Sequence, residues 1–269
     1  MALGDSTSVG VGDPLGGKEV SRIGAGALPG QGWRGWAALL ADALSSSHEV
    51  AFANLATSGA TTPSVAGAQL PRTGGGRIDI ASLIVGVNDT MRSTFDPLQI
   101  RDCLLECAAE LTRRGAVLLT VRFHDHGQVF GLPAWLRRPL WRRIELVNAA
   151  YDDVHATYGG IRVDLAACPE VYQREFWSID RLHPGERGHR TLARVFADHL
   201  VRQGIAIAVP PSITCDSQVP PTPWGDALWM LREGAPWVGR RAFDLAPWAA
   251  RMAVTEARAT FQRKQPSAA

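Results

Sequence analysis

Ser6, Asp180 and His183 are the residues whose types and spacing best suit nucleophilic chemistry. Ser6 follows Gly4-Asp5 near the start of the chain, and Asp180 stands three residues before His183. A serine hydroxyl is a poor nucleophile at neutral pH and needs a base beside it. Histidine ionises near neutrality, and a carboxylate fixes its tautomer and stabilises the imidazolium. Pro184 disfavours helical backbone at His183 and suits a first helical turn, which predicts His183 on a loop that enters a helix.

Two further segments could supply hydrogen bonds to a developing negative charge. Gly59 lies in residues 54–61, and a glycine there lets the backbone approach a ligand and present its N–H. Asn88 lies in Gly86-Val87-Asn88-Asp89, where its carboxamide could donate to the oxyanion of a tetrahedral intermediate. Taken singly, each of these segments also fits an ordinary turn. Only their combination predicts an acyl-transfer site.

These residues are predicted to lie at the ends of parallel strands. Apolar runs favour strands at residues 50–55, 78–87, 116–121 and 161–165, and a short strand precedes Gly4. Periodicity and end signals predict helices at residues 33–44, 97–114, 142–158 and 184–203. Alternating strands and helices of this length favour parallel pairing through right-handed crossovers. We therefore expect a three-layer α/β/α sandwich with Ser6, Gly59, Asn88 and His183 at its carboxyl edge.

The order of these motifs resembles the SGNH hydrolase superfamily, which includes the GDSL-like esterases and lipases. The resemblance extends from residue 4 to about residue 203 and rests on Gly4-Asp5-Ser6, Gly59, Gly86-x-Asn88-Asp89 and Asp180-x-x-His183-Pro184. It implies a mostly parallel, flavodoxin-like sheet and a Ser6 nucleophile with Asp180 and His183 completing the triad. It also implies an oxyanion hole made by the Ser6 N–H, the Gly59 N–H and the Asn88 side chain, with no metal or organic cofactor.

Two features depart from the superfamily pattern. Thr7 stands where leucine often follows Gly-Asp-Ser, at a position without a catalytic role. Only Met1-Ala2-Leu3 precede Gly4, so the first strand is short although Ser6 depends on it for its position.

The expected activity is hydrolysis of a small-molecule carboxylic ester through an acyl-enzyme on Ser6. An acyltransferase or biosynthetic tailoring enzyme would use the same triad, and a dry apolar pocket would favour it because excluding water suppresses hydrolysis. A non-catalytic binding module is a third alternative. Such a module has no need of intact Ser6, Asn88, Asp180 and His183, so we rank it last.

The segment after residues 116–121 contains His124-Asp125-His126 and several apolar residues. A metal site would need a third or fourth ligand at plausible spacing, and the sequence offers none, so no metal is predicted. His126, Phe130 and Trp135 are instead candidates for the wall of a substrate pocket. A loop packed on the core would have a similar composition.

Residues 206–269 differ in composition from residues 1–205, which we take as the catalytic domain. The segment contains Pro210, Pro211, Pro220, Pro221 and Pro223, followed by Trp224, Trp229, Trp237 and Trp248. Tryptophans at this density are expected to be buried. We therefore predict a Pro/Trp-rich helical extension packed on the catalytic domain or on a partner subunit, as structural cladding or as a wall of the substrate entrance.

Charge and composition argue against several other classes of protein. The 269 residues carry a formal net charge of +2 without a long run of Lys or Arg, so no nucleic-acid partner is expected. No segment reaches the roughly 20 apolar residues of a membrane span. No secretory leader precedes Gly4, which predicts a cytoplasmic protein. The four cysteines form no CxxC pair, and the oligomeric state is left open.

Overall fold

A computed structural model describes residues 1–14, 32–215, 247, 250–251 and 253–254. The helical elements in these residues are α1 (Ser6–Val9), α2 (Gly35–Ser45), α3 (Thr62–Ser64), η1 (Val65–Gln69), η2 (Leu70–Thr73), α4 (Val87–Thr90), α5 (Pro97–Arg113), α6 (His126–Val129), α7 (Ala134–Tyr158), η3 (Leu165–Ala167), η4 (Pro169–Tyr172), η5 (Arg174–Phe176) and α8 (Glu186–Arg202). The strands are β1 (Ala2–Gly4), β2 (Ile80–Ile84), β3 (Val117–Arg122) and β4 (Ile161–Asp164).

Within the described residues the sheet has four parallel strands in the order β1-β2-β3-β4. Gly4 pairs with Ile84, and Arg122 pairs with Asp164, so the last residues of neighbouring strands lie side by side. Because all strands run the same way, the loops that leave β1, β2 and β3 emerge at one edge. This edge is where parallel sheets bind ligands.

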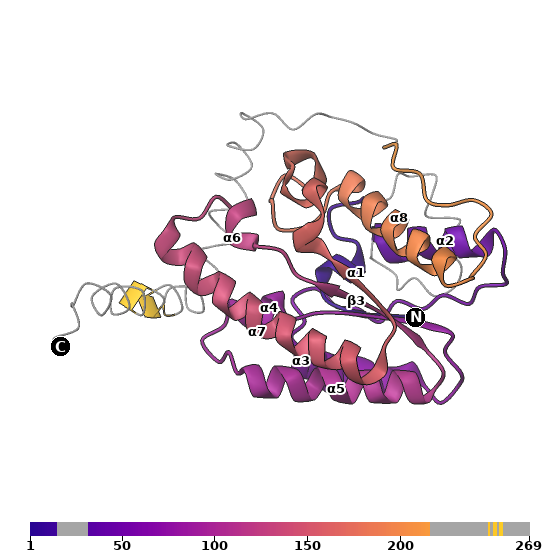
Figure 1. The fold of residues 1–269 in the computed structure, drawn as a ribbon, viewed down its shortest axis with the longest axis horizontal. Coiled ribbons are helices and arrows are strands. Elements are labelled where there is room, and N and C mark those ends of the chain that lie inside the picture. Colours follow the sequence, from indigo (N-terminus) through magenta and orange to yellow (C-terminus); the bar gives the residue numbers. More distant parts are fainter. Residues whose placement is uncertain (15–31, 216–246, 248–249, 252, 255–269) are drawn as a thin grey trace, which may run out of the picture.

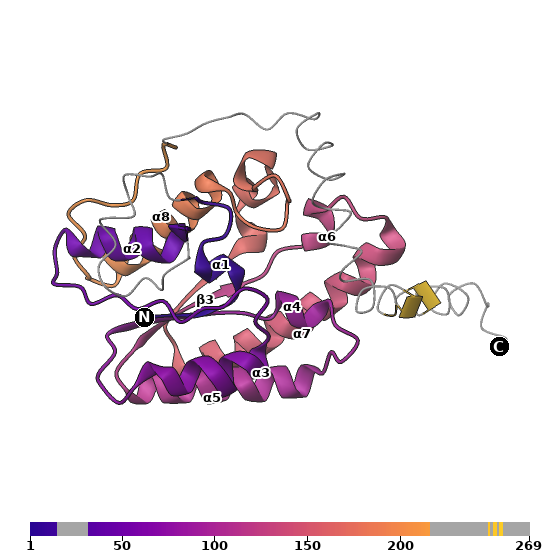
Figure 2. The ribbon, with the colours of Figure 1, turned by 180° about the vertical axis from the view of Figure 1, so that it is seen from behind.

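Helices cover both faces of this sheet (Figures 1 and 2). Helices α2 and α8 pack together on one face, and α5 and α7 pack together on the other. Trp36 of α2 and Phe196 of α8 stack with ring centroids 5.0 Å apart. The predicted three-layer α/β/α sandwich is therefore confirmed.

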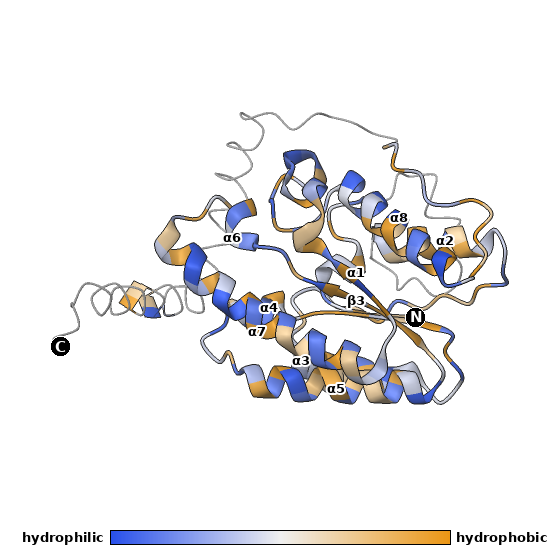
Figure 3. Ribbon diagram, viewed as in Figure 1, coloured by the Kyte–Doolittle hydropathy of each residue, from blue (hydrophilic) through white to orange (hydrophobic). Residues whose placement is uncertain are grey.

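Apolar side chains of the strands fill the space between the helix layers. Figure 3 shows the strands as largely hydrophobic, whereas the helices alternate between apolar and polar residues. The largest fully buried side chains include Leu3, Leu83, Leu118 and Leu119 on the strands, and Leu104, Ile144, Tyr151 and Leu200 on the helices. This core fixes the strand ends from which the loops with Ser6 and Asn88 leave.

The predicted strand at residues 50–55 is wrong. This segment contacts β1 through a single parallel bridge between Ala2 and Asn54, with Leu55 N–H donating to Ala2 O at 2.8 Å. Because β1 has only three residues, it offers little backbone for a partner strand. Val50 is exposed, so the apolar run lies along the sheet edge and not inside the core.

Helix α7 begins at Ala134, well before the predicted start at residue 142. Pro139 lies inside it and is buried. A proline inside a helix removes one backbone hydrogen bond and clashes with the carbonyl four residues before it, and the burial and packing of the following turns outweigh this cost. The other long helices, α2, α5 and α8, lie within one or two residues of their predicted ranges.

The first residues of the predicted extension run along the α/β sandwich. Ala208 N–H donates to Ser47 Oγ at 2.8 Å beyond the end of α2, and Arg190 of α8 donates to Ser212 O at 3.3 Å. The four tryptophans at positions 224, 229, 237 and 248 lie outside the described residues. Burial of the Trp-rich segment therefore stays a prediction. No helix in the described ranges combines the length and the apolar character needed to cross a bilayer.

Candidate active site

Ser6 is held at the carboxyl end of β1 by a tight turn. Asp5 caps α1, its side chain accepting from Thr7 N–H at 3.0 Å, and Ser6 is the first helical residue. Gly4 has a φ of 149°, and a Cβ atom there would lie 2.2 Å from Ile84 O. Glycine is therefore required where β1 comes close to β2, and this approach sets the position of Ser6.

A buried glutamine fixes the same turn from the other side. Gln69 Nε2 donates to Gly4 O at 2.8 Å, and Gly4 N–H donates to Gln69 Oε1 at 2.9 Å. Gln69 ends η1, a π-helical turn far along the chain, so the sequence gives no signal for this contact. Asn54 Nδ2 donates to Ser8 O at 2.7 Å and ties α1 to the loop that carries Gly59.

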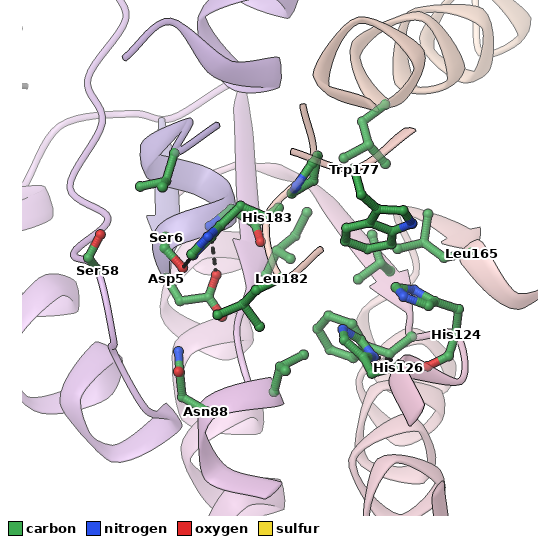
Figure 4. Close-up of a pocket in the computed structure, with 18 of the residues that line it drawn as sticks. Asp5, Ser6, Ser58, Asn88, His124, His126, Leu165, Trp177, Leu182 and His183 are labelled. Atoms are coloured by element: carbon green, nitrogen blue, oxygen red, sulfur yellow. Dashed lines mark hydrogen bonds between the residues drawn. The ribbon is translucent and has the colours of Figure 1, made fainter. Parts of the chain in front are cut away.

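Ser6, His183 and Asp180 form a continuous chain of hydrogen bonds. His183 Nε2 lies 2.8 Å from Ser6 Oγ, and His183 Nδ1 lies 2.7 Å from Asp180 Oδ2. Since a carboxylate only accepts, Nδ1 carries the proton of the neutral imidazole, and Nε2 is free to accept from the serine hydroxyl. Figure 4 shows Ser6 and His183 pointing toward each other.

Asp180 is held as a carboxylate by hydrogen bonds on both of its oxygens. Its Oδ1 accepts from Leu182 N–H at 2.9 Å, from His183 N–H at 3.0 Å and from Ser178 Oγ at 2.5 Å. Burial alone would raise the pKa of Asp180, but the hydrogen bonds from His183 and Ser178 outweigh it and lower the pKa to about 2. Asp180 is therefore ionised at neutral pH.

Three residues that line the same cavity carry hydrogen-bond donors: Ser6 and Gly59 through their N–H groups, and Asn88 through its carboxamide. Among the described residues, neither backbone N–H has an acceptor. Gly59 has a φ of 77°, which suits glycine. Asn88 Nδ2 donates to Ala60 O at 3.0 Å, and this bond holds the carboxamide while its second N–H stays available.

Two buried carboxylates follow strands β1 and β2. Burial raises the pKa of Asp5 to about 6, a change that the Thr7 N–H and the nearby His183 partly oppose. Burial also raises the pKa of Asp89, whose carboxylate accepts from Thr62 N–H at 3.1 Å and from Thr62 Oγ1 at 2.9 Å. The Asp89 bonds join α4 to α3, so they hold Asn88 and Gly59 in their relative places.

The hydrogen-bonded chain of Ser6, His183 and Asp180 opens onto a cavity of about 200 Å³. Its wall is largely apolar and includes Val121, Phe123, Leu165, Trp177 and Leu192. Pockets for drug-sized ligands usually have volumes of ~300–1,000 Å³, so this cavity suits a smaller group.

Of the three residues predicted to contact substrate, only His126 lines this cavity. The Phe130 ring contacts the His126 ring, with centroids 6.1 Å apart, and does not line the cavity. Trp135 is on the first turn of α7 and 47% exposed, because the helix begins earlier than predicted. In the described part of the chain, no three His, Cys, Asp or Glu side chains are grouped so that they could hold a metal ion.

A three-layer parallel α/β sandwich with a Ser-His-Asp chain at its carboxyl edge has the architecture of a serine hydrolase. The model of the GDSL-like Lipase/Acylhydrolase family matches residues 2–191. The chain belongs to this family and is an ester-hydrolysing enzyme.

Several solved structures share the fold. The psychrotrophic esterase EstA from Pseudoalteromonas sp. is 14% identical, with a TM-score of 0.52, and the match covers 76% of this chain and 97% of that chain. LAE5, an alpha/beta hydrolase enzyme from the metagenome of Lake Arreo in Spain, is 20% identical, with a TM-score of 0.57 and coverages of 76% and 94%. An acetyl xylan esterase from Geobacillus stearothermophilus is 19% identical, with a TM-score of 0.54 and coverages of 78% and 95%. A comparison with curated proteins gives no match.

Proposed function

We propose that the enzyme hydrolyses carboxylic esters through an acyl-enzyme on Ser6. His183 Nε2 takes the hydroxyl proton while Ser6 Oγ bonds to the ester carbonyl carbon. The imidazolium then gives this proton to the leaving alkoxide as the carbon–oxygen bond of the ester breaks. In the second half, a water molecule loses a proton to His183 and attacks the acyl carbon, and Ser6 Oγ leaves and recovers its proton.

The observation that carries this proposal is the pair of hydrogen bonds, 2.8 and 2.7 Å long, that joins Ser6, His183 and Asp180 beside the cavity. Asp180, ionised at neutral pH, orients the imidazole and stabilises the imidazolium that forms during attack. Ester hydrolysis needs these groups, since it passes through an anionic tetrahedral intermediate.

The oxyanion of that intermediate would be stabilised by the Ser6 N–H, the Gly59 N–H and the Asn88 carboxamide. Two of these donors have no acceptor in the described residues, so they need no rearrangement before they bind the oxyanion. One such donor is typically worth ~3–4 kcal/mol of transition-state stabilisation.

Labelling with a fluorophosphonate probe, followed by peptide mass spectrometry, tests the nucleophile. We expect the probe on Ser6 in the wild type, no labelling of Ser6→Ala, and retained labelling of Ser58→Ala. Ser58 provides the matched control because it is a second serine in the cavity wall. Labelling of folded Ser6→Ala at the wild-type rate would refute the proposal. Product analysis with and without an added alcohol distinguishes hydrolysis from acyl transfer through the same acyl-enzyme.

A further inference from the structure

Two histidines in the cavity wall take no part in the proposed mechanism. His124 and His126 follow β3 at the carboxyl edge of the sheet, and their exposed fractions are only 2% and 6%. Figure 4 shows the two rings beside Trp177, across the pocket from Ser6 and His183. They are therefore placed to contact a part of the substrate away from the reacting carbonyl.

Polar atoms of both rings are left without a protein partner. In the described part of the chain, neither Nδ1 nor Nε2 of His124 has a hydrogen-bond partner. His126 Nδ1 lies 3.0 Å from His124 O, and because a carbonyl only accepts, Nδ1 carries the proton. His126 Nε2 is then a free acceptor, while His124 offers one donor and one acceptor. A buried polar group without a partner is unfavourable, and because both residues line the cavity, a group bound there could supply the missing hydrogen bonds.

Burial keeps both imidazoles neutral at neutral pH. It lowers the pKa of His124 well below the ordinary value for histidine, and the proximity of His126 lowers it further. Burial lowers the pKa of His126 to about 4, although the hydrogen bond to His124 O and the carboxylate of Asp125 oppose this. Arg137 binds that carboxylate at 2.8 Å. The pair is therefore suited to a neutral hydrogen-bonding group and not to an anion.

Aromatic contacts hold the two rings in place. His124 stacks on His126, with centroids 4.0 Å apart and an angle of 19° between the planes, and Trp177 lies 5.1 Å from His124. The Trp177 N–H donates to Val171 O at 2.6 Å, so only its apolar surface is left for the cavity. This packing preorganises the free nitrogens and leaves little room for either ring to rotate toward another partner.

We propose that His124 and His126 form a subsite for a neutral hydroxyl group of the ester substrate. This inference rests on the proposed function of Ser6. A hydroxyl group donates one hydrogen bond and accepts others, so it can donate to His126 Nε2 and accept from the His124 N–H. An alkyl group of the same size would leave these nitrogens unpaired. Sites built to bind a hydroxyl group therefore discriminate against the analogue that lacks it.

The hydroxyl group can belong to the acyl part or to the alcohol part of the ester, and two pairs of substrates distinguish these sources. The first pair is p-nitrophenyl 3-hydroxybutyrate and p-nitrophenyl butyrate, which differ in the acyl group. The second pair is glycerol 1-monobutyrate and propyl butyrate, which differ in the alcohol. For each pair, the ratio of kcat/KM for the hydroxylated ester to that for the alkyl ester is measured.

We expect a ratio of about 5–10 or more in one of the two pairs, as one or two hydrogen bonds would give. His124→Phe and His126→Phe keep aromatic rings but remove the nitrogens, and should lower this ratio to about one. His124→Gln, which retains a donor and an acceptor, should keep part of the preference. His199→Phe on α8 makes the same chemical change away from the cavity and should leave the ratio unchanged.

Ratios of one or less for both pairs in an active wild-type enzyme would overturn the subsite and leave the proposed function intact. A preference that survives in His124→Phe and His126→Phe would overturn it as well. If His124→Phe does not fold, His126→Phe and His124→Gln still test the subsite. A wild type that turns over no ester and whose Ser6 resists fluorophosphonate would overturn the proposed function, and the subsite with it.

Discussion

Replacing Asp5 by asparagine should stabilise the protein at pH 8 and reduce its activity. Asp5 is only 4% exposed, and its carboxylate accepts hydrogen bonds from the N–H and the side chain of Thr7 in the turn. Asparagine retains the side-chain oxygen that accepts the bond from the Thr7 N–H, so the cap of α1 is kept. The variant therefore removes a buried negative charge beside Ser6 without removing the turn.

The expected gain in the free energy of unfolding follows from the pKa of Asp5. Burial raises it from 3.8 to about 6, so the folded state keeps the proton to a higher pH than the unfolded state. The free energy of unfolding then falls as the pH rises through this window and stays lower above pH 6. A difference of about two pH units corresponds to ~3 kcal/mol, at ~1.4 kcal/mol for each unit. Asp5→Asn should recover ~1–3 kcal/mol at pH 8, since the carboxamide is itself partly desolvated.

The effect on catalysis should have the opposite sign. The charge of Asp5 is close enough to His183 to interact with it, and an ionised Asp5 favours the imidazolium that forms during attack. Loss of this charge should lower kcat by up to about tenfold, a charge–charge effect in a partly screened site. A stabilising change that slows the reaction is typical of residues beside a catalytic centre.

Urea denaturation at pH 4.5 and pH 8 measures the difference, with ester hydrolysis assayed on the same samples. The gain in unfolding free energy for Asp5→Asn should be clearly larger at pH 8 than at pH 4.5. Asp96→Asn makes the same chemical change at the exposed N-cap of α5 and controls for the loss of a capping charge. An equal gain at both pH values, or a loss at pH 8, would refute the account of Asp5 as a destabilising buried charge.

Three further predictions concern the catalytic chain and its support. His183→Ala should lower kcat as far as Ser6→Ala does, because the members of such a chain act as a unit; a folded variant of either kind that keeps most of its activity in a p-nitrophenyl ester assay would contradict this. Asn88→Ala should lower kcat by ~10²–10³-fold with a smaller change in KM, and steady-state kinetics that show a change in KM alone would assign Asn88 to substrate contact. Gln69→Leu leaves the N–H of Gly4 unpaired and leaves its C=O with the Thr57 N–H alone, and should lower the free energy of unfolding by ~1–3 kcal/mol in urea denaturation; no measurable loss would mean that water replaces the side chain.

The layered fold and the hydrogen-bonded contact of Ser6, His183 and Asp180 could be predicted because their signals are local. Ser6, Asn88 and His183 each stand beside an element boundary that the sequence marks with glycine, apolar runs or proline. In a parallel sheet the carboxyl ends of strands meet at one edge, so the boundaries alone bring these residues together. The bond between Asp180 and His183 spans only three positions and needs no knowledge of the tertiary structure.

The features that escaped prediction depend on contacts between distant segments. Gln69 binds Gly4 across the fold, and a glutamine in a helical turn gives no sign of such a role. The strand expected at residues 50–55 has the right composition, but strand formation requires a partner along its length, and within the segment only Asn54 forms a bridge with β1. Trp135 is partly exposed to solvent because α7 starts at Ala134. The sequence does not indicate this early start, because a proline such as Pro139 is unfavourable inside a helix.

Two buried histidines show that hydrogen bonding, and not burial, separates a side chain that supports the fold from one that can contact a ligand. His189 of α8 is fully buried, yet its Nδ1 accepts from Trp36 N–H at 3.2 Å and its Nε2 donates to Val11 O at 3.0 Å. Both nitrogens are used, so His189 joins α2 and α8 to the loop after Ser6 and has nothing left for a ligand. His124 is as deeply buried but has neither nitrogen paired within the described residues, and it lines the cavity. Since folding alone would favour an apolar side chain at that position, a histidine there is best explained by a polar group that arrives with the substrate.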